Sequence, residues 1–366
     1  MASRQCTLES LEMNSSTFWQ NKSVFLTGHT GFKGAWLSIY LDLLKAKVTG
    51  YSLSPLNQTN LFDAANVESK INHIIGDIRD FEQLKQQVFK AQPQIIFHLA
   101  AQALVRPSYH APLETYSTNV MGTAHVLEAA RQCASVRCVV VITSDKCYEN
   151  REWVWGYREN DPMGGYDPYS SSKGAAELVT QAYYSSYFSE KNDPIGVASA
   201  RAGNVIGGGD WAEDRLVPDF VRAVEQQIAI VLRNPLATRP WQHVLEPLTG
   251  YLQLAEKLFD EPQKYSGAWN FGPEENDIRS VQWVIEFMEK LWDGALSWEL
   301  DKAAQPHEAQ LLKLDCSKVH SKLAWIPKWQ LEQALEQTVA WYQAYLSQKY
   351  DMQDVCLSQI KAYLDT

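Results

Sequence analysis

The sequence of 366 residues lacks several features that would define its function at once. It has no run of about 18 uncharged apolar residues, so we expect no membrane span. It has no basic run, and its 33 Lys and Arg against 43 Asp and Glu give a net charge of −10. Nucleic acid and anionic membrane surfaces are therefore poor candidate partners. Residues 1–20 are mostly polar, and they show neither a signal peptide nor a transit peptide.

Patterns typical of metal sites and disulfide frameworks are also missing. No C-x-x-C pair occurs, and no cluster of cysteines and histidines has zinc-ligand spacing. The cysteines stand apart, at Cys6, Cys133, Cys138, Cys147, Cys316 and Cys356. We therefore expect reduced, mostly buried thiols, no metal, and a cytoplasmic protein.

Short apolar runs alternate with segments of helical spacing, and this alternation predicts the fold. We expect strands at residues 23–26, 47–53, 95–99, 137–142 and 196–200, and helices at 36–44, 82–89, 119–133 and 172–187. Such βαβ units predict an α/β fold, a Rossmann-type doubly wound parallel sheet. The pattern loosens after about residue 202, with helices expected at 217–227, 281–292 and 331–346 and a strand at 229–232. This part predicts a smaller mixed α/β C-terminal substrate lobe.

A glycine-rich turn lies between the first strand and the first helix. It reads Gly28, His29, Thr30, Gly31, Phe32, Lys33 and Gly34. Glycines let the backbone approach a pyrophosphate closely, and the helix N-terminus supplies free N–H groups. The turn therefore predicts a dinucleotide site, with a purely structural turn as the alternative.

The second strand is not followed by the carboxylate that often binds the ribose of NAD. No arginine for a 2′-phosphate follows either, so NAD is favoured over NADP. Ser52 is a candidate for the missing hydrogen bond, with Ser54 as the alternative. Two other stretches fit the adenine and ribose end of the cofactor, namely Asp77 with Ile78, and Leu99, Ala100 and Ala101.

Tyr169 and Lys173 are four residues apart, which places them on one face of a helix. A tyrosine with a pKa of about 10 is a poor base at neutral pH. A nearby ammonium and a cationic nicotinamide ring would favour its phenolate. Ser144 follows a buried strand, and ligands of open α/β sheets bind at the carboxyl ends of strands.

Taken together, these stretches resemble the extended short-chain dehydrogenase/reductase family over about residues 20–345. The likeness also includes Asn119, the segment Arg201–Val205, His307-Glu308 and residues 323–325. It implies that Tyr169 is a base at a sugar C4 and that Lys173 is its modulator and a ribose contact. It further implies that Ser144 positions the substrate, and that Asn119, Tyr169 and Lys173 belong to the NAD site.

Asp145 and Lys146 directly follow Ser144 and favour a 4,6-dehydratase over a 4-epimerase. Loss of water from C5 and C6 needs a base and an acid near one face of the sugar. The commoner dehydratase pattern is Asp followed by Glu, so Lys146 leaves the identity of the C5 base open. A solvated loop pair is the alternative. The likeness favours CDP-glucose as the substrate, which would be converted to CDP-4-keto-6-deoxyglucose for deoxysugar or O-antigen biosynthesis. Two alternatives remain: dehydration of a dTDP- or GDP-hexose, and 4-epimerisation of a nucleotide sugar.

The substrate lobe should hold a nucleotide-sugar pyrophosphate, which arginine binds well. The likeness favours Arg239 for this role. It also suggests Asn204, Arg215, Leu216 and Val217 near the substrate, with Asn270 and His307 behind them. Arg233, which lies in the same region, and Gln102 are further candidates, with surface or loop positions as the alternative for the arginines and His307. We expect an NAD-binding domain at 20–202 and about 236–275, a substrate lobe at about 203–235 and 276–350, and an N-terminal extension at 1–19. The family implies a homodimer through helices near 113–133 and 169–187, with a homotetramer as the alternative.

Overall fold

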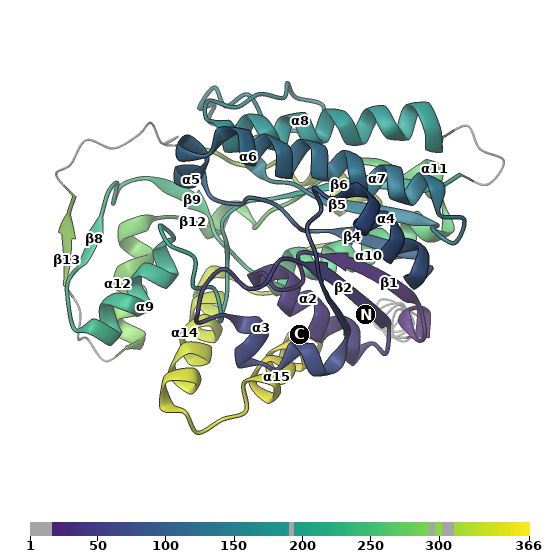
Figure 1. The fold of residues 1–366 in the computed structure, drawn as a ribbon. Helices are drawn as coiled ribbons and strands as arrows, with labels where there is room; N and C mark the ends of the chain where they lie inside the picture. Colours follow the sequence, from purple (N-terminus) through teal and green to yellow (C-terminus); the bar gives the residue numbers. More distant parts are fainter. Residues whose placement is uncertain (1–16, 190–193, 293–296, 302–310) are drawn as a thin grey trace, which may run out of the picture.

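The computed structural model describes residues 17–189, 194–292, 297–301 and 311–366 (Figure 1). In this part of the chain, seven parallel strands form one sheet in the order β11-β6-β5-β4-β1-β2-β3. Their bounds are Ser23–Thr27 for β1, Lys47–Ser52 for β2, Asn72–Ile75 for β3, Ile95–His98 for β4, Cys138–Ile142 for β5, Gly196–Ala202 for β6 and Gly267–Phe271 for β11. The expected Rossmann-type α/β fold is confirmed.

Helices cover both faces of this sheet (Figure 1). One face carries α4 (Phe81–Ala91), α7 (Gly122–Gln132) and α8 (Pro168–Tyr183), and the other carries α2 (Phe32–Leu43), α10 (Leu245–Asp260) and α15 (Met352–Leu364). Within β1, Val24 and Leu26 pack into the core around α2 and α10, whereas Phe25 packs into the core with α4 and α7. Because both faces of each strand are buried, the strands read as continuous apolar runs.

A smaller group of elements lies beside the sheet, to the left in Figure 1. It contains α9 (Leu216–Gln226), β8 (Ile230–Leu232), α12 (Val281–Leu291) and β13 (Trp298–Leu300). Strand β8 pairs with β13, and β9 (Thr238–Pro240) pairs with β12 (Ile278–Ser280). Between these segments in sequence, α10 packs on the main sheet and β11 extends it beside β6. The chain therefore leaves the main sheet and returns to it.

The remaining elements complete the described structure. They are α3 (Leu61–Ala64), α5 (Val105–His110), α6 (Pro112–Tyr116), β7 (Val205–Ile206), β10 (Gln242–His243), α11 (Pro262–Tyr265), α13 (Ser317–Leu323) and α14 (Leu331–Ser347), with single helical turns η1 (Val67–Lys70), η2 (Ser117–Met121), η3 (Asp145–Cys147), η4 (Tyr184–Phe188) and η5 (Glu275–Asp277). None of the helices in the described ranges is both long and apolar enough to cross a membrane.

Helices α2 and α8 each begin four residues earlier than the sequence predicts, and both differences place site residues on helices. Helix α2 starts at Phe32 because Gly31 occupies the N-cap. Helix α8 starts at Pro168, where the Asp167 side chain caps the helix by accepting a hydrogen bond from the backbone N–H of Ser170. Proline is well suited to the first turn, where its missing N–H has no partner to lose. Tyr169 thereby lies in the first turn of α8.

Candidate active site

A cleft of about 1070 Å³ lies at the carboxyl ends of β1, β4, β5 and β6. Its walls come from the glycine turn, the loop after β4, the turn η3 and the start of α8, and the smaller lobe closes it with α9, β8 and β9. Ligands of doubly wound folds bind at this edge of the sheet. Many of the predicted site residues therefore meet in one place.

The glycine turn is shaped for a close approach of backbone to ligand. Gly28 has a φ of 78°, and a Cβ there would lie 2.6 Å from the backbone N of Ala100. A Cβ on Gly34 would lie 2.1 Å from the carbonyl O of Gly28. Gly31 caps α2 without a side chain, so the N–H groups of the first helical turn are not covered by a capping side chain. This cradle fits a pyrophosphate.

A hydroxyl pair takes the place of the ribose carboxylate after β2. The Thr30 hydroxyl donates to the carbonyl O of Leu53 (2.9 Å) and lies 2.9 Å from the Ser52 Oγ. Because Thr30 has a single hydroxyl proton, Ser52 must donate to Thr30. Ser52 lines the cleft, and a hydroxyl that donates to Thr30 still has lone pairs with which it can accept a hydrogen bond.

Near the predicted adenine end, Asp77 already has a partner. Arg79 Nη2 lies 2.6 Å from the Asp77 carboxylate, and Arg79 Nε lies 2.8 Å from the same oxygen. The hydrogen bonds from Arg79 hold the pKa of Asp77 below its usual range. Arg79 also lines the cleft, and it was not predicted from the sequence as a site residue. The Asp-x-Arg spacing in the turn after β3 could have indicated it.

The side chain of His29 turns away from the cleft. Its Nε2 lies 2.6 Å from the Nδ1 of His73 on β3, and its ring packs edge-on against Phe62. Burial, followed by the neighbouring His73, lowers the pKa of His29 to about 3, so the ring is neutral. By contrast, other members of the predicted cofactor set line the cleft, namely Ile78, Leu99, Ala100 and Ala101 with Phe32 and Lys33 of the turn.

The catalytic candidates converge where β5 ends and α8 begins. Ser144 caps η3, and its Oγ donates to Asp145 Oδ1 at 2.9 Å and hydrogen bonds with Tyr169. Lys173 Nζ donates to the carbonyl O of Ile142 at 3.2 Å. Asp145 is 3% exposed, and its Oδ2 has no hydrogen-bond partner within the described residues. Lys146 lines the same wall.

Burial dominates the ionisation of this cluster. It raises the pKa of Tyr169 to about 12, and the hydrogen bond with Ser144 opposes this shift only in part. It lowers the pKa of Lys173 to about 8, against the pull of Glu177. The pKa of Lys33 falls to about 7 through burial and the nearby charges of Arg215 and Lys173. The protein alone therefore keeps Tyr169 as a phenol, and ionising it requires added positive charge in the cleft.

Asn119 lies behind the cleft wall instead of on it. Its Oδ1 accepts from the backbone N of Gln102 at 2.8 Å, and its Nδ2 donates to the carbonyl O of Gln102 at 3.0 Å and to the Ser172 Oγ at 2.8 Å. Asn119 thus links the loop after β4 to α8. Gln102 does line the cleft, although its side-chain amide bonds back to Leu104.

The predicted substrate residues divide into three groups. Asn204, Arg215, Leu216, Val217, Arg233 and Arg239 line the cleft. Arg215 pairs with Asp210 at 2.7 Å, and Arg233 pairs with Asp214 at 3.1 Å. Asn270 is fully buried away from the cleft, where its Oδ1 accepts from the Tyr148 hydroxyl at 2.7 Å. His307 lies outside the described residues.

This combination of a Rossmann-type sheet with Ser144, Tyr169 and Lys173 at its carboxyl edge defines an extended short-chain dehydrogenase/reductase. A family model described as GDP-mannose 4,6 dehydratase matches residues 25–338, and the chain belongs to that family. A CDP-glucose 4,6-dehydratase of Salmonella typhimurium is 53% identical over 91% of this chain and 94% of the relative.

More distant relatives share the same architecture. A dTDP-glucose 4,6-dehydratase of Haemophilus influenzae is 25% identical over 87% of this chain and 97% of the relative. Among solved structures, a UDP-glucose 4-epimerase from Stenotrophomonas maltophila with bound NAD aligns with a TM-score of 0.79 at 18% identity, over 89% of this chain and 99% of the other. A dTDP-glucose 4,6-dehydratase from Bacillus anthracis in complex with NAD aligns with a TM-score of 0.71 at 22% identity, over 88% and 96%.

Proposed function

We propose that this chain is a lyase that converts CDP-glucose to CDP-4-keto-6-deoxyglucose and water, as a step towards deoxysugars of the O-antigen type. The observation that carries the proposal is the buried carboxylate of Asp145, which lies beside Ser144 and Tyr169 in one cleft. A 4-epimerase moves hydrogen at C4 alone, whereas a dehydratase also needs an acid for the departing C6 hydroxyl. The Salmonella relative supports the same choice and the CDP-linked substrate.

The cleft fits NAD as the cofactor. Gly28 and Gly34 let the turn pack tightly against its neighbouring backbone at the start of α2, where the helix N-terminus can receive a pyrophosphate, and Ser52 offers an acceptor near the ribose position. Bound NAD would supply reversible oxidation of the sugar at C4. Its positive nicotinamide would also provide the charge that Tyr169 needs in order to lose its proton.

The residues of the cluster then divide the proton transfers among them. Tyr169 accepts the proton of the C4 hydroxyl, Lys173 supports the phenolate with its ammonium, and Ser144 holds the substrate oxygen. The resulting C4 ketone acidifies the C5 hydrogen. Asp145, in its carboxylic acid form, donates a proton to the leaving C6 hydroxyl, and we assign removal of the C5 proton to the free amine of Lys146, the neighbouring residue on the cleft wall. Lys146 then returns this proton to C5 as the hydrogen taken from C4 is delivered to C6, so the reaction is redox-neutral overall.

Arginines of the lobe and of the segment that follows it provide the charges for the nucleotide-sugar pyrophosphate. We propose Arg239 as the main phosphate ligand, with Arg215 and Arg233 near it. We also retain the interleaved division of the chain into an NAD-binding domain (20–202 and about 236–275) and a substrate lobe (about 203–235 and 276–350). In this division the lobe contributes α9 and β8 to the wall of the cleft.

We further propose a homodimer formed through α6, α7 and α8. Leu113 is 83% exposed and Leu178 is 62% exposed on these helices, and a helix face of this kind is typical of an interface. Sedimentation should give a dimer for the wild type and a monomer for Leu178→Glu. The five described cysteines are free and buried, which supports our proposal of a cytoplasmic location.

The function is tested by incubating the purified protein with NAD and, separately, with CDP-, dTDP- and GDP-glucose. A 4-keto-6-deoxy sugar is recognised by its absorbance in alkali and by a product mass lower by one water. We expect this product from CDP-glucose at the highest rate. Recovery of CDP-galactose without a keto sugar would show a 4-epimerase instead, and preference for another nucleotide would contradict the assignment of CDP.

A further inference from the structure

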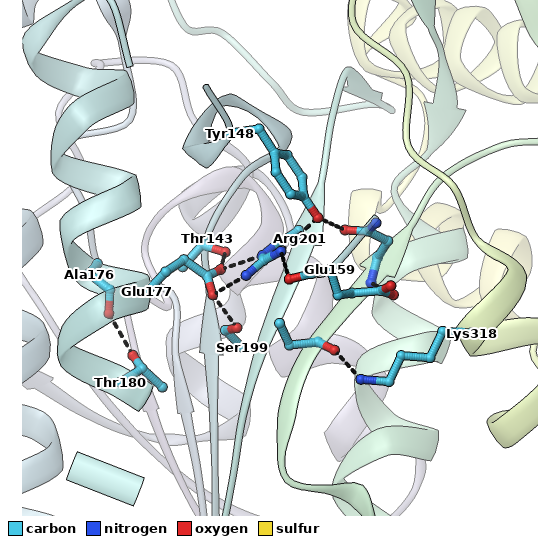
Figure 2. Close-up of polar contacts among 11 residues, drawn as sticks. Thr143, Tyr148, Glu159, Ala176, Glu177, Thr180, Ser199, Arg201 and Lys318 are labelled. Atoms are coloured by element: carbon cyan, nitrogen blue, oxygen red, sulfur yellow. Dashed lines mark hydrogen bonds and ion pairs between the residues drawn. The ribbon is translucent and has the colours of Figure 1, made fainter. Parts of the chain in front are cut away.

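A buried ion pair lies directly behind the catalytic residues, between Glu177 of α8 and Arg201 of β6 (Figure 2). Tyr169, Lys173 and Glu177 follow one another at intervals of four residues, so they share one face of α8. Glu177 thus lies one turn beyond Lys173, on the side away from the cleft. Its carboxylate belongs to neither the glycine turn nor the cleft wall.

The pair is fully bonded. Arg201 Nε donates to Glu177 Oε1 at 2.9 Å and Nη2 donates to Oε2 at 2.8 Å, with side chains only 3% and 5% exposed. Ser199 donates to the same carboxylate at 2.5 Å, and Thr143, the residue before Ser144, also donates to it. Buried ion pairs of this kind add little net stability compared with apolar packing. A role in the site explains the pair better than a role in stability.

The other side of the guanidinium holds the turn that carries Asp145. Arg201 Nη1 donates to the Tyr148 hydroxyl at 2.6 Å, and Tyr148 in turn donates to Asn270 Oδ1 at 2.7 Å. The guanidinium lies 4.8 Å from the centre of the Tyr148 ring. Tyr148 ends the η3 turn, because its backbone N–H donates to the carbonyl O of Asp145 at 3.4 Å. One side chain therefore connects α8 to the turn of the proposed acid.

We propose that Glu177 and Arg201 are a positioning pair for the proposed reaction. Glu177 keeps Lys173 in its ammonium form next to Tyr169, and Arg201 holds the turn from Asp145 to Tyr148 against α8. The pair thus keeps the groups for oxidation at C4 and the group for water loss in one fixed arrangement. This inference rests on the proposed function.

Glu177 is the negative charge that acts on Lys173. Burial would raise the pKa of Glu177, but Arg201 and the hydrogen bonds from Ser199 and Thr143 hold it below its usual range, so the group stays ionised. Burial lowers the pKa of Lys173 to about 8, and Glu177 is the largest influence in the opposite direction.

The other titratable groups that act on Lys173, or on which it acts, come from several elements, namely Cys147 of η3, Lys33 of α2 and His98 of β4. Tyr169 lies one turn before Lys173 on the same face of α8. Burial raises the pKa of Cys147 and lowers that of His98 to about 3, so both are neutral at neutral pH. Glu177→Gln should therefore lower the pKa of Lys173, because it removes the opposing carboxylate.

The first experiment compares wild type, Glu177→Gln and Glu246→Gln, the last being a matched change at a fully buried glutamate of α10. Single-turnover formation of reduced nicotinamide from CDP-glucose is measured across pH. We expect the alkaline limb to move down by about one pH unit in Glu177→Gln and to stay in place in Glu246→Gln. NMR titration of Lys173 should show the same downward shift without any substrate.

The second experiment uses Tyr148→Phe, which removes the hydroxyl between Arg201 and Asn270 and keeps the ring. We expect reduced nicotinamide to form at nearly the wild-type rate and keto product to form about tenfold more slowly, because a small displacement of Asp145 affects only water loss. If Glu177→Gln does not fold, Glu177→Gln/Arg201→Gln removes both charges together and should lower the pKa of Lys173 by a smaller amount, because Glu177 is nearer to Lys173 along α8 and loss of the Arg201 charge opposes the shift only in part.

An unchanged pKa of Lys173 in the Glu177 variants, or equal slowing of both steps in Tyr148→Phe, would overturn the positioning pair. Failure of the proposed function looks different, because the wild type itself would then give no keto product from CDP-glucose. In that case the NMR titration of Lys173 still decides whether Glu177 controls its charge.

Discussion

Gly203 lies against the free oxygen of Asp145, and an alanine at this position tests the proposed acid without changing it. A Cβ on Gly203 would lie 2.0 Å from Asp145 Oδ2 and 2.5 Å from its Cγ. Ordinary contacts between heavy atoms are about 3.5 Å, so the carboxyl group must move by more than about 1 Å. The displaced atoms are the end of a side chain, which the fold can accommodate. A misplacement of this size costs about 100-fold in rate.

The assay follows a single turnover of CDP-glucose in Gly203→Ala. Reduced nicotinamide should still form, because Tyr169 and Lys173 are untouched, while the keto product should appear about 100-fold more slowly. Gly272→Ala is the control, since the nearest atom to a Cβ there is the Cys316 Sγ at 3.3 Å. A folded Gly203→Ala variant that forms product at the wild-type rate would refute the assignment of Asp145 as the acid.

Three further predictions concern the cofactor site, the modulator and the stability of the fold. In Gly34→Ala the Cβ would lie 2.1 Å from the backbone O of Gly28. Overpacking costs about 1–3 kcal/mol, so NAD should bind about 5- to 150-fold more weakly if the turn shifts to relieve the clash; fluorescence titration measures this affinity, and unchanged affinity would argue against the cradle. The pKa of Lys173 is about 8, so kcat/KM of the wild type should fall above about pH 8 as the ammonium is lost; a constant kcat/KM up to about pH 10 would contradict this role. Burial raises the pKa of Glu246 from 4.5 to about 7, so the folded state holds this proton more tightly than the unfolded chain. Its contribution to stability is complete below about pH 4.5 and declines by about 3 kcal/mol as the pH rises to about 7; chemical unfolding of Glu246→Gln should lose this part of the pH dependence, and an identical profile in both proteins would contradict it.

Much of the fold could be predicted from the sequence because burial leaves a direct pattern. Strands β1, β4 and β5 are covered on both faces, so they appear as apolar runs, and the helices between them show helical spacing. Strand β3 was missed since it reads Asn-His-Ile-Ile and lies at the sheet edge, where little apolar surface is buried. Helix α10 and strand β11 were missed because a proline-rich stretch precedes them, although β11 completes the main sheet.

The site was predictable where a motif lies at the carboxyl end of a strand. The positions of Ser144, Tyr169 and Lys173 in one cluster follow from strand order and helical spacing. The sequence could not show which side chains lie in the cleft and which lie one layer behind it. Asn119 and Asn270 do not line the cleft; their side chains donate hydrogen bonds to the backbone of loops behind the cleft wall, at Gln102 and Tyr157 respectively. The pair of Glu177 and Arg201 joins residues 24 positions apart, and only the packing of α8 on β6 brings them together.

The most direct test of the account follows hydrogen through one turnover. CDP-glucose carrying deuterium at C4 is converted by the wild-type protein with NAD in ordinary water, and the product is analysed by NMR. Removal of hydrogen from C4 and its return after water loss predict deuterium at C6 of a 4-keto-6-deoxy sugar. Deuterium remaining at C4, in CDP-galactose or in unchanged CDP-glucose, would contradict the proposed dehydration.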